Sequence, residues 1–323
     1  MKIAILGAGG TGSCIGYFLQ KANDEVWLVD VNAEHMQAVR ENGLRVALSN
    51  VKAKTTINET IRINATTSAK EAGPCDLVII LTKEPSTRAA VEGSRELFDS
   101  GSFVLMMQNG IGNEEALFDY FPEDRIGRGV ATVSSTLVAP GVIHGRYGAD
   151  PLVLRFGSLN GRAPWQLKEL LGHMNASGAD SELSDDIMKT VWDKALVNLP
   201  TSFVTGLVGI PAPGIINTQP GRELMSNILS EAIDVASACG ITYDKQKEID
   251  VFLAEYGPHM AKFSSAARDM FNHRITEVEA INGAIGRLGR KYGIPTPVND
   301  TIADLVRTIQ LTYAEQDEAQ KNA

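Results

Sequence analysis

Hydrophobic positions in the first half of the chain alternate between short continuous runs and helical spacing. Four runs of apolar, often β-branched residues have the pattern of strands covered on both faces: 2–6, 25–30, 75–82 and 102–108. Helical spacing follows the first two runs, over residues 10–22 and 33–43, and two further strands are predicted at 44–48 and 60–66. Strands that alternate with helices predict βαβ units and a mainly parallel sheet.

The pattern changes near residue 184, after which helical spacing dominates and strand signals nearly vanish. Five helices are predicted there, at 186–208, 218–239, 244–256, 274–292 and 298–316. We therefore predict an α/β fold with two domains. Residues 1–184 form an N-terminal Rossmann-type parallel-sheet domain that binds a dinucleotide, and residues 185–323 form an all-helical substrate and catalytic domain.

The first predicted helix of the second half carries an unusual row of polar side chains on one face. Steps of four, four and three residues separate its members, which are Lys194, Asn198, Ser202 and Thr205. Apolar residues surround this row. A lysine in such a place can stabilise negative charge on the oxygen of a carbonyl that is being reduced, and can donate the proton. The alternative is a lysine that extends past apolar neighbours into water.

The segment GAGGTG at residues 7–12 follows the first predicted strand and opens a helix. Its GxGxxG spacing predicts a dinucleotide-binding loop, in which Gly7 permits the tight turn, Gly9 lets the backbone approach a pyrophosphate, and Gly12 allows close packing. The helix start, with Gly10 and Thr11, then offers N–H groups and a positive dipole end to the phosphates. The alternative is a glycine-rich turn without a ligand.

Asp30 ends the second predicted strand. A carboxylate at that point accepts hydrogen bonds from the adenosine ribose diol of NAD. It would repel the 2′-phosphate of NADP, at a cost of about 1–4 kcal/mol per charge pair. Val31 and Asn32 follow, so no arginine compensates directly. The sequence therefore favours NAD(H), with NADP(H) as the alternative. Asp30 could instead only cap the helix that starts near Ala33.

Composition narrows the classes of partner. The chain is 44% hydrophobic and 21% charged, as in ordinary globular proteins, and its net charge of −9 disfavours nucleic-acid binding. No apolar run is long enough for a signal peptide or a membrane span. The three cysteines and five histidines lack metal-binding spacing, so no metal is expected. We expect a cytoplasmic enzyme that acts on a small molecule, without nucleic-acid or membrane partners; the sequence leaves a homodimer open.

Five segments together resemble the ketopantoate reductase (2-dehydropantoate 2-reductase) family. They are GAGGTG at 7–12, LTK at 81–83, MQNGIGNEE at 107–115, WDKALVN at 192–198 and SSAARDMFNHRITEVEAINGAIGRLGRKYGIPTP at 264–297. Their order and spacing match over nearly the whole chain, and TEVEAING and GIPTP are especially specific. The resemblance implies an N-terminal Rossmann domain, a helical C-terminal domain, and reduction of a 2-oxo acid with a nicotinamide cofactor.

The resemblance also implies catalytic and cofactor-binding roles for particular residues. It makes Lys194 the general acid to the C2 oxygen, and Glu277 the group that binds the substrate hydroxyl and tunes the lysine. Asn109 would lie near the nicotinamide and the lysine, and Lys83 beside the cofactor and the cleft. Structural alternatives are that Asn109 only forms a turn, that Lys83 is an ordinary strand-end cation, and that Glu277 supports its helix by pairing with Arg274.

On the substrate side, the resemblance implies that Asn198 contacts the substrate and that Ser265 binds its carboxylate, with Ser264 as a neighbouring alternative. The family has a second asparagine one turn after Asn198, where this chain has Ser202, with Pro200 between. Proline deletes one helical hydrogen bond and can kink the segment. We expect Ser202 to contact the substrate, and this departure favours a different 2-oxo acid. The missing arginine after the second strand likewise departs from the family's usual NADPH preference.

The leading prediction is reduction of ketopantoate to pantoate, a step towards pantothenate, with Lys194 delivering the proton. The first alternative is the same chemistry on another branched 2-oxo acid. A second is a dinucleotide-binding regulator without catalysis, against which the retention of Lys194, Asn198 and Glu277 argues. A third is a β-hydroxyacid-type dehydrogenase, which the QNG and TEVEAING segments disfavour.

Overall fold

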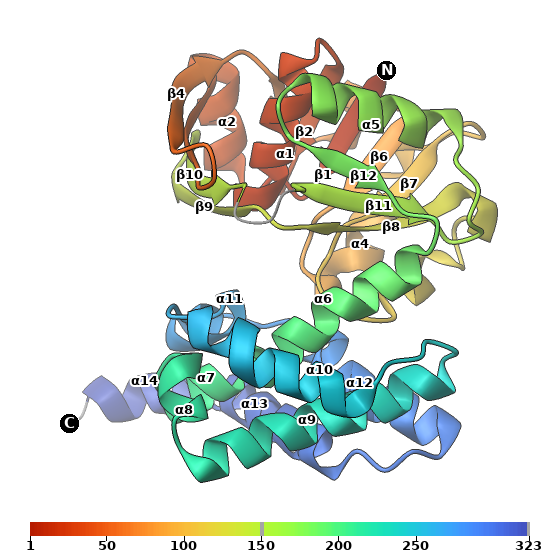
Figure 1. Cartoon of the computed structure of the whole chain (residues 1–323). Helices are drawn as coiled ribbons and strands as arrows, with labels where there is room; N and C mark the ends of the chain where they lie inside the picture. Colours follow the sequence, from red (N-terminus) through yellow and green to blue (C-terminus); the bar gives the residue numbers. More distant parts are fainter. Residues whose placement is uncertain (149–151, 322–323) are drawn as a thin grey trace. The chain divides into compact units, whose positions relative to one another are not determined.

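The computed structural model describes residues 1–148 and 152–321 of the 323-residue chain, which forms two compact units. The first unit comprises Met1–Gln108 and Asn113–Thr190, and the second comprises Asn109–Gly112 and Val191–Ala323. Strands gather in the first unit and helices in the second (Figure 1). The predicted fold class is confirmed.

An eight-stranded sheet forms the centre of the first unit, in the order β12-β11-β8-β7-β6-β1-β2-β5. Its strands are β1 (Lys2–Leu6), β2 (Glu25–Val29), β5 (Asn64–Thr66), β6 (Leu77–Ile80), β7 (Phe103–Met106), β8 (Ile126–Ala131), β11 (Leu154–Ser158) and β12 (Ser181–Leu183). Neighbouring strands are parallel except β8 and β11, which are antiparallel. The chain order reverses direction at β1, so the carboxyl ends of β1 and β6 flank a topological switch point.

Helices and 3₁₀ turns cover both faces of this sheet. They are α1 (Gly10–Lys21), α2 (Ala33–Asn42), α3 (Ala69–Ala72), η1 (Glu84–Ser86), α4 (Thr87–Glu92), η2 (Arg95–Leu97), η3 (Asn113–Leu117), η4 (Glu123–Arg125) and α5 (Trp165–Ala176). Alternate residues of β1 join different cores: Ile3 and Ile5 pack with α1, α2 and α5, whereas Ala4 and Leu6 pack with α3 and α4. The continuous apolar runs therefore reflect burial on both faces.

A second sheet of four strands, in the order β4-β3-β10-β9, was not anticipated from the sequence. It consists of β3 (Leu44–Asn50), β4 (Thr55–Ile61), β9 (Ser134–Ala139) and β10 (Val142–Tyr147), and it contacts α1. The strand predicted at 60–66 is wrong as a single element, because β4 ends at Ile61 and β5 begins at Asn64 in the other sheet.

The second unit is helical. Its elements are α6 (Ile187–Ser202, which begins in the first unit), α7 (Val204–Val208), α8 (Ala212–Ile216), α9 (Gln219–Ala238), α10 (Lys245–Val251), the π-helical turn η5 (Phe252–Tyr256), η6 (Gly257–His259), α11 (Ser265–Phe271), η7 (Val278–Ala280), α12 (Asn282–Tyr292), α13 (Pro297–Leu311) and α14 (Tyr313–Lys321). Its core contains Trp192 and Phe203, which are almost fully buried, and the inner face of α9. None of the described helices is long and apolar enough to cross a membrane.

Two predicted helices of this unit are interrupted. The helix predicted over 186–208 is divided at Phe203, between α6 and α7. The helix predicted over 274–292 begins only at Asn282. Before it, the backbone bonds elsewhere: the N–H of Thr276 donates to the side chain of Gln310, and the carbonyl of Ala280 accepts from Ile111. These long-range bonds replace helical ones, which local spacing does not reveal.

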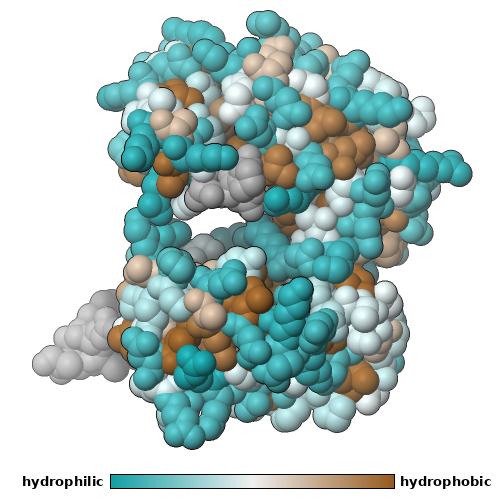
Figure 2. All heavy atoms as spheres, viewed as in Figure 1, coloured by the Kyte–Doolittle hydropathy of each residue, from teal (hydrophilic) through white to brown (hydrophobic). Residues whose placement is uncertain are grey.

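Hydrophilic side chains dominate the faces of both units seen in Figure 2, where hydrophobic residues form small patches. Scattered exposed apolar residues are normal for a folded protein. The described residues contain no group of three or more His, Cys, Asp or Glu side chains arranged to hold a metal ion.

Candidate active site

The glycine loop between β1 and α1 is shaped by close backbone packing. Gly7 has φ +98°, and a Cβ there would overlap the backbone nitrogen of Thr82 at the end of β6. A Cβ at Gly12 would overlap the carbonyl oxygen of Gly7. Apart from Gly9 and its two chain neighbours, no heavy atom of the described chain lies within 4 Å of a Cβ placed on Gly9. Side chains are thus excluded at Gly7 and Gly12, and the room is at Gly9, where a pyrophosphate must approach.

The start of α1 presents backbone N–H groups beside this open space. Gly9 is the N-cap residue, and among the described residues no side chain caps the helix there. The N–H groups of the first turn, which includes Gly10 and Thr11, have no acceptor within the helix. A Cβ on Gly10 would lie 2.5 Å from the carbonyl oxygen of Ser135 on β9, so Gly10 is required for this packing. The geometry suits an anion at the helix start.

Asp30 lies directly after β2, and its Oδ1 accepts a hydrogen bond from the N–H of Asn32 at 2.9 Å. The cap of α2 is Asn32, whose side chain accepts from the N–H of His35, so the alternative of Asp30 as the helix cap is wrong. Val31 between them is 96% exposed. Asp30 therefore stiffens a turn at the carboxyl end of β2 and places a half-buried carboxylate there.

Lys83 follows the end of β6, next to the glycine loop. It is the N-cap residue of η1 and comes directly after Thr82, whose backbone nitrogen packs against Gly7. Gln108 fixes this region: its Nε2 donates to the carbonyl of Thr82 at 2.7 Å and to the hydroxyl of Thr87 at 2.8 Å. No role was predicted for Gln108 from the sequence, although an amide at the end of the apolar run 102–108 was a usable signal.

A buried ion pair lies behind Gln108 and was also missed. Arg128 on β8 is fully buried, and its Nε lies 3.4 Å from a carboxylate oxygen of Glu114. Burial lowers the pKa of Arg128, while the charge of Glu114 opposes that effect. Arg128 also donates to the carbonyl of Gln108 at 3.5 Å. The pair anchors the residues that precede and follow the segment 109–112.

In the helical unit, α6 carries three of the four polar residues predicted to form one row. Lys194 and Asn198 are half-buried, and Ser202, the last residue of α6, is buried. Thr205, the fourth, lies beyond the break at Phe203 on α7, and its hydroxyl donates to the carbonyl of Thr201 at 2.8 Å.

Ser264 and Ser265 have different surroundings. The hydroxyl of Ser264 caps α11 by accepting from the N–H of Ala267, and it donates to the carbonyl of Ser202 at 2.6 Å. Ser264 therefore joins the start of α11 to the end of α6. Ser265, the first residue of α11, is exposed beside this junction, so it is the serine of the pair whose hydroxyl is not used for capping.

Asn109 and Glu277 belong to segments that meet at Ala280. Gly110 has φ +99°, and a Cβ there would overlap the carbonyl oxygen of Ala280. The N–H of Ile111 donates to the same oxygen at 2.8 Å. Glu277 immediately precedes η7, which ends at Ala280. The glycine after Asn109 thus allows the backbone contact that brings these two segments together.

One apolar core supports all of these segments of the second unit. Ile111, Trp192 and Val278 belong to the same buried cluster. Lys194, Asn198, Ser202, Ser265, Glu277 and Asn109 thus all belong to the helical unit. The sheet unit contains Gly7, Gly9, Gly10, Thr11, Gly12, Asp30 and Lys83.

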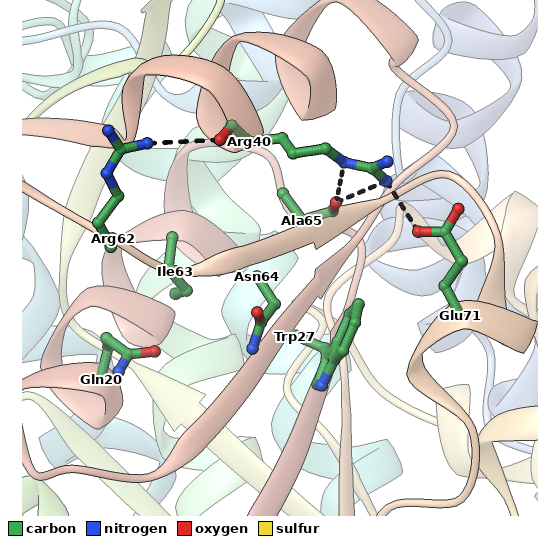
Figure 3. Close-up of a pocket in the computed structure, with 8 residues that line it drawn as sticks. All are labelled: Gln20, Trp27, Arg40, Arg62, Ile63, Asn64, Ala65 and Glu71. Carbon is green, nitrogen blue, oxygen red and sulfur yellow. Dashed lines mark hydrogen bonds and ion pairs between the residues drawn. The ribbon is translucent and has the colours of Figure 1, made fainter.

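A hollow of about 450 Å³ in the sheet unit lies elsewhere, at the edge strand β5 (Figure 3). Its cations are already engaged: Arg40 bonds the carbonyl of Ala65 and the carboxylate of Glu71, and Arg62 bonds the carbonyl of Glu41. Arg40 thereby covers an edge strand, a common protection against strand pairing. None of the predicted site residues lines this hollow.

A Rossmann-type sheet with a glycine loop at its switch point, followed by a helical unit that carries polar residues, defines a dinucleotide-dependent oxidoreductase. Residues 3–160 match the family model described as ketopantoate reductase PanE/ApbA, and residues 186–310 match the model of its C-terminal region. The chain belongs to the ketopantoate reductase family, whose members are NAD(P)-dependent oxidoreductases.

Relatives span almost the whole chain. The 2-dehydropantoate 2-reductase of Halobacterium salinarum is 27% identical over 310 residues, which cover 96% of this chain and 99% of that protein. The same-named protein of Streptococcus pyogenes serotype M1 is 28% identical over 309 residues, 95% of this chain and 97% of that protein.

Solved structures give the same picture. The 2-dehydropantoate 2-reductase of Geobacter metallireducens superposes with a TM-score of 0.84 at 27% identity, over 95% of this chain and 99% of that one. D-mandelate dehydrogenase in a ternary structure with NADH and anilino(oxo)acetate has a TM-score of 0.85, also at 27% identity, over 97% and 99%. The NADH in that neighbour supports a nicotinamide dinucleotide as cofactor.

Proposed function

We propose that the protein reduces ketopantoate (2-dehydropantoate) to pantoate, with Lys194 as the general acid. The observation that carries this proposal is the half-buried lysine on α6, with Asn198 one turn further, in a chain of the ketopantoate reductase family. When bound, the reduced nicotinamide supplies the hydride, which goes to the C2 carbon. Lys194 Nζ stabilises the negative charge that develops on the C2 oxygen and transfers its proton there, giving the alcohol.

The other residues of the helical unit orient the substrate in this proposal. Glu277 accepts a hydrogen bond from the substrate hydroxyl and holds the lysine in its charged, proton-donating form, because an opposite charge favours an ammonium. Asn109 lies near the nicotinamide and the lysine. Asn198 and Ser202 bond substrate oxygens, and the exposed hydroxyl of Ser265 bonds the carboxylate. A homodimer remains a prediction.

The sheet unit would bind the cofactor through its backbone. The N–H groups at Gly9, Gly10 and Thr11 would hold the pyrophosphate, at the start of α1, and the closely packed Gly7 and Gly12 set the loop. Two side chains complete this part of the site: Asp30, which accepts from the adenosine ribose diol, and Lys83, beside the nicotinamide end. The half-buried carboxylate of Asp30, followed by Val31 rather than a cation, supports NADH over NADPH.

A second candidate is the same reaction on another 2-oxo acid with a branched or aromatic side chain. The structural similarity to D-mandelate dehydrogenase, solved with an aryl-substituted oxoacid analogue, favours it. Ser202 favours it too, since a serine in place of the family's asparagine leaves more room beside Asn198. Mandelate corresponds to a 2-oxo acid that carries a phenyl ring, so the pocket would have to accept that ring.

One experiment separates these candidates. Purified protein is assayed with ketopantoate, a panel of branched aliphatic 2-oxo acids and phenylglyoxylate, each with NADH and with NADPH, and kcat/KM values are compared. The proposal predicts the highest kcat/KM for ketopantoate with NADH. A higher value for another acid supports the second candidate. Binding of NADH without reduction of any carbonyl compound would instead indicate a dinucleotide-binding regulator.

A further inference from the structure

His35, on the first turn of α2, is fully buried against the glycine loop and has no part in the proposed chemistry. Its Nε2 lies 3.0 Å from the carbonyl oxygen of Ala8 and 3.2 Å from the hydroxyl oxygen of Ser13. Its Nδ1 lies 2.9 Å from the backbone nitrogen of Gly141, in the turn between β9 and β10. One imidazole therefore joins the glycine loop, α2 and the small sheet.

The partners of His35 fix its protonation state. A backbone N–H can only donate, so the Nδ1 that faces Gly141 must be the unprotonated nitrogen of the ring. A carbonyl oxygen can only accept, so the Nε2 that faces Ala8 must carry the proton. The geometry is therefore satisfied by one form alone, the neutral ring with its proton on Nε2. In the doubly protonated ring, the N–H at Nδ1 would face the N–H of Gly141, and two donors cannot form a hydrogen bond.

The bond to Ala8 determines where the next N–H points. The carbonyl of Ala8 and the N–H of Gly9 belong to one planar trans peptide group, so they point in opposite directions. His35 and the hydroxyl of Ser13, which donates at 2.8 Å, hold the carbonyl on the buried side. The Gly9 N–H is then directed away from them, towards the open side of the loop.

We propose that His35, as the neutral Nε2–H ring, is a positioning residue of the dinucleotide site that orients the Gly9 N–H towards the bound pyrophosphate. This inference rests on the proposed dinucleotide-dependent function. His35 touches no cofactor itself; it acts through the Ala8–Gly9 peptide. The same ring also ties the loop to the small sheet, because it contacts both Ala8 and Gly141. Strand β9 of that sheet packs against Gly10.

The requirement for a neutral ring gives the site a dependence on acidity. Burial lowers the pKa of His35, and the bond to Ala8 and the nearby charge of Asp30 oppose this. Because the folded pKa lies below the unfolded value of about 6.5, the unfolded state takes up the proton first as pH falls. The contribution of the neutral ring to the free energy of unfolding is therefore fully present above about pH 6.5 and falls as the pH drops towards the folded pKa. Below the folded pKa the folded protein carries the protonated ring, and its affinity for the dinucleotide is lost.

Two non-titrating variants separate the two bonds of the ring. In His35→Gln, the amide nitrogen can reach the Nε2 position and donate to Ala8. In His35→Asn, the amide oxygen can reach the Nδ1 position and accept from Gly141, but nothing donates to Ala8. Calorimetric titration with NAD⁺, which is stable in mild acid, measures Kd at about pH 7.5 and at the lowest pH at which the unaltered protein is still folded.

We expect His35→Asn to weaken NAD⁺ binding about tenfold at the higher pH, and His35→Gln to stay within about threefold of the unaltered protein. The unaltered protein should bind more weakly in acid, and His35→Gln should lose that dependence. His144→Gln, at an exposed histidine on β10, is the matched control and should change neither value.

Thermal unfolding of each variant shows whether it is folded at the temperature of titration. Should His35→Asn not fold, the comparison of His35→Gln with the unaltered protein at the two pH values still decides. An acid dependence that persists in His35→Gln, or a Kd of folded His35→Asn equal to that of the unaltered protein, overturns the inference alone. If the unaltered protein binds neither NAD⁺ nor NADP⁺, the proposed function fails and the inference falls with it.

Discussion

The two units of the molecule supply their predicted site residues in different ways. In the sheet unit, one continuous segment, 7–12, supplies five of the seven predicted residues, and its shape follows from close backbone packing at Gly7 and Gly12. The other two, Asp30 and Lys83, follow the ends of β2 and β6. In the helical unit, the predicted residues come from four segments: 109–112, α6, the start of α11 and the residues before η7. Hydrogen bonds to two carbonyls join them in pairs: the Ser264 hydroxyl to Ser202 links α11 to α6, and the Ile111 N–H to Ala280 links 109–112 to η7.

This difference affects what a substitution can test. A change at Gly7, Gly10 or Gly12 alters backbone packing first and chemistry second, because a Cβ there would overlap other backbone atoms, whereas Gly9 has open space around it. A substitution of an exposed or half-buried side chain in the helical unit removes a functional group but leaves the backbone in place, because other residues position that backbone. Substitutions in the helical unit therefore test the chemical step. Substitutions in the glycine loop separate steric effects on stability from effects on cofactor binding.

The largest effect is expected for Lys194→Ala. Without the general acid, kcat for the best 2-oxo acid should fall about a thousandfold, since positioned proton transfer and charge stabilisation contribute effects of that order. Binding of the dinucleotide, measured by fluorescence titration, should be unchanged, because Lys194 is not among its predicted ligands, which apart from Asn109 are in the sheet unit. Lys189→Ala removes a lysine from the same helix and should retain full kcat. A Lys194→Ala enzyme with near-normal turnover would contradict the assignment.

The contrast between a continuous loop and a site made of distant segments also explains which features could be predicted from the sequence. The strands β1, β2, β6 and β7 were predictable because burial on both faces makes them continuous apolar runs. The GxGxxG spacing then placed the cofactor loop. The small sheet was not predictable as a separate layer, because nothing local in β3 or β4 states which sheet a strand joins.

Contacts between distant residues account for what was missed in the site itself. His35 looks like any polar residue of a short helix, and only its neighbours on the buried face, Met36 and Val39, hint that it points inward. Its partners Ala8 and Gly141 lie far away in the sequence. The irregular backbone before α12 likewise depends on an acceptor at Ala280 for Ile111. Spacing along the chain contains no information on such pairs.

Gly12→Ala and Gly9→Ala form a matched pair that tests the steric account of the loop. A Cβ at Gly12 overlaps the carbonyl of Gly7, so we expect a loss of about 3 kcal/mol in the free energy of unfolding. Gly9 has φ −65° and open space around it, so Gly9→Ala should unfold within about 1 kcal/mol of the unaltered protein. Its methyl group should nevertheless weaken dinucleotide binding about tenfold by occupying the approach to the pyrophosphate.

Chemical denaturation and NADH titration measure the two effects independently. Equal stability of both variants would show that the glycines do not differ in packing. Normal NADH binding by Gly9→Ala would show that the ligand does not approach at Gly9.

Asp30→Asn tests the cofactor preference. Removing the negative charge should weaken NADH binding and relieve repulsion of the 2′-phosphate, so the ratio of kcat/KM for NADPH to that for NADH should rise about tenfold. The amide retains an oxygen that can accept from the N–H of Asn32, so the turn should persist. Glu34→Gln, an exposed acid in the first turn of α2, removes a nearby charge without touching that turn and should leave the ratio unchanged. A ratio that does not move in Asp30→Asn would contradict a role in ribose recognition.

The smallest effect is expected at Ser202, where the helical unit departs from its family. Ser202→Asn restores the family's residue one turn after Asn198, and should raise kcat/KM for ketopantoate relative to bulkier 2-oxo acids about threefold, mainly through KM. Because Ser202 is buried at the end of α6 and its carbonyl accepts from Ser264, the larger side chain should also cost about 1 kcal/mol of stability.

Ser202→Ala removes the hydroxyl without adding volume. If the hydroxyl bonds the substrate, KM rises in Ser202→Ala; if only the space matters, Ser202→Ala behaves as the unaltered protein and Ser202→Asn alone shifts the preference. No change of preference in either variant would place Ser202 outside the pocket, and the departure from the family would then concern helix packing around Pro200.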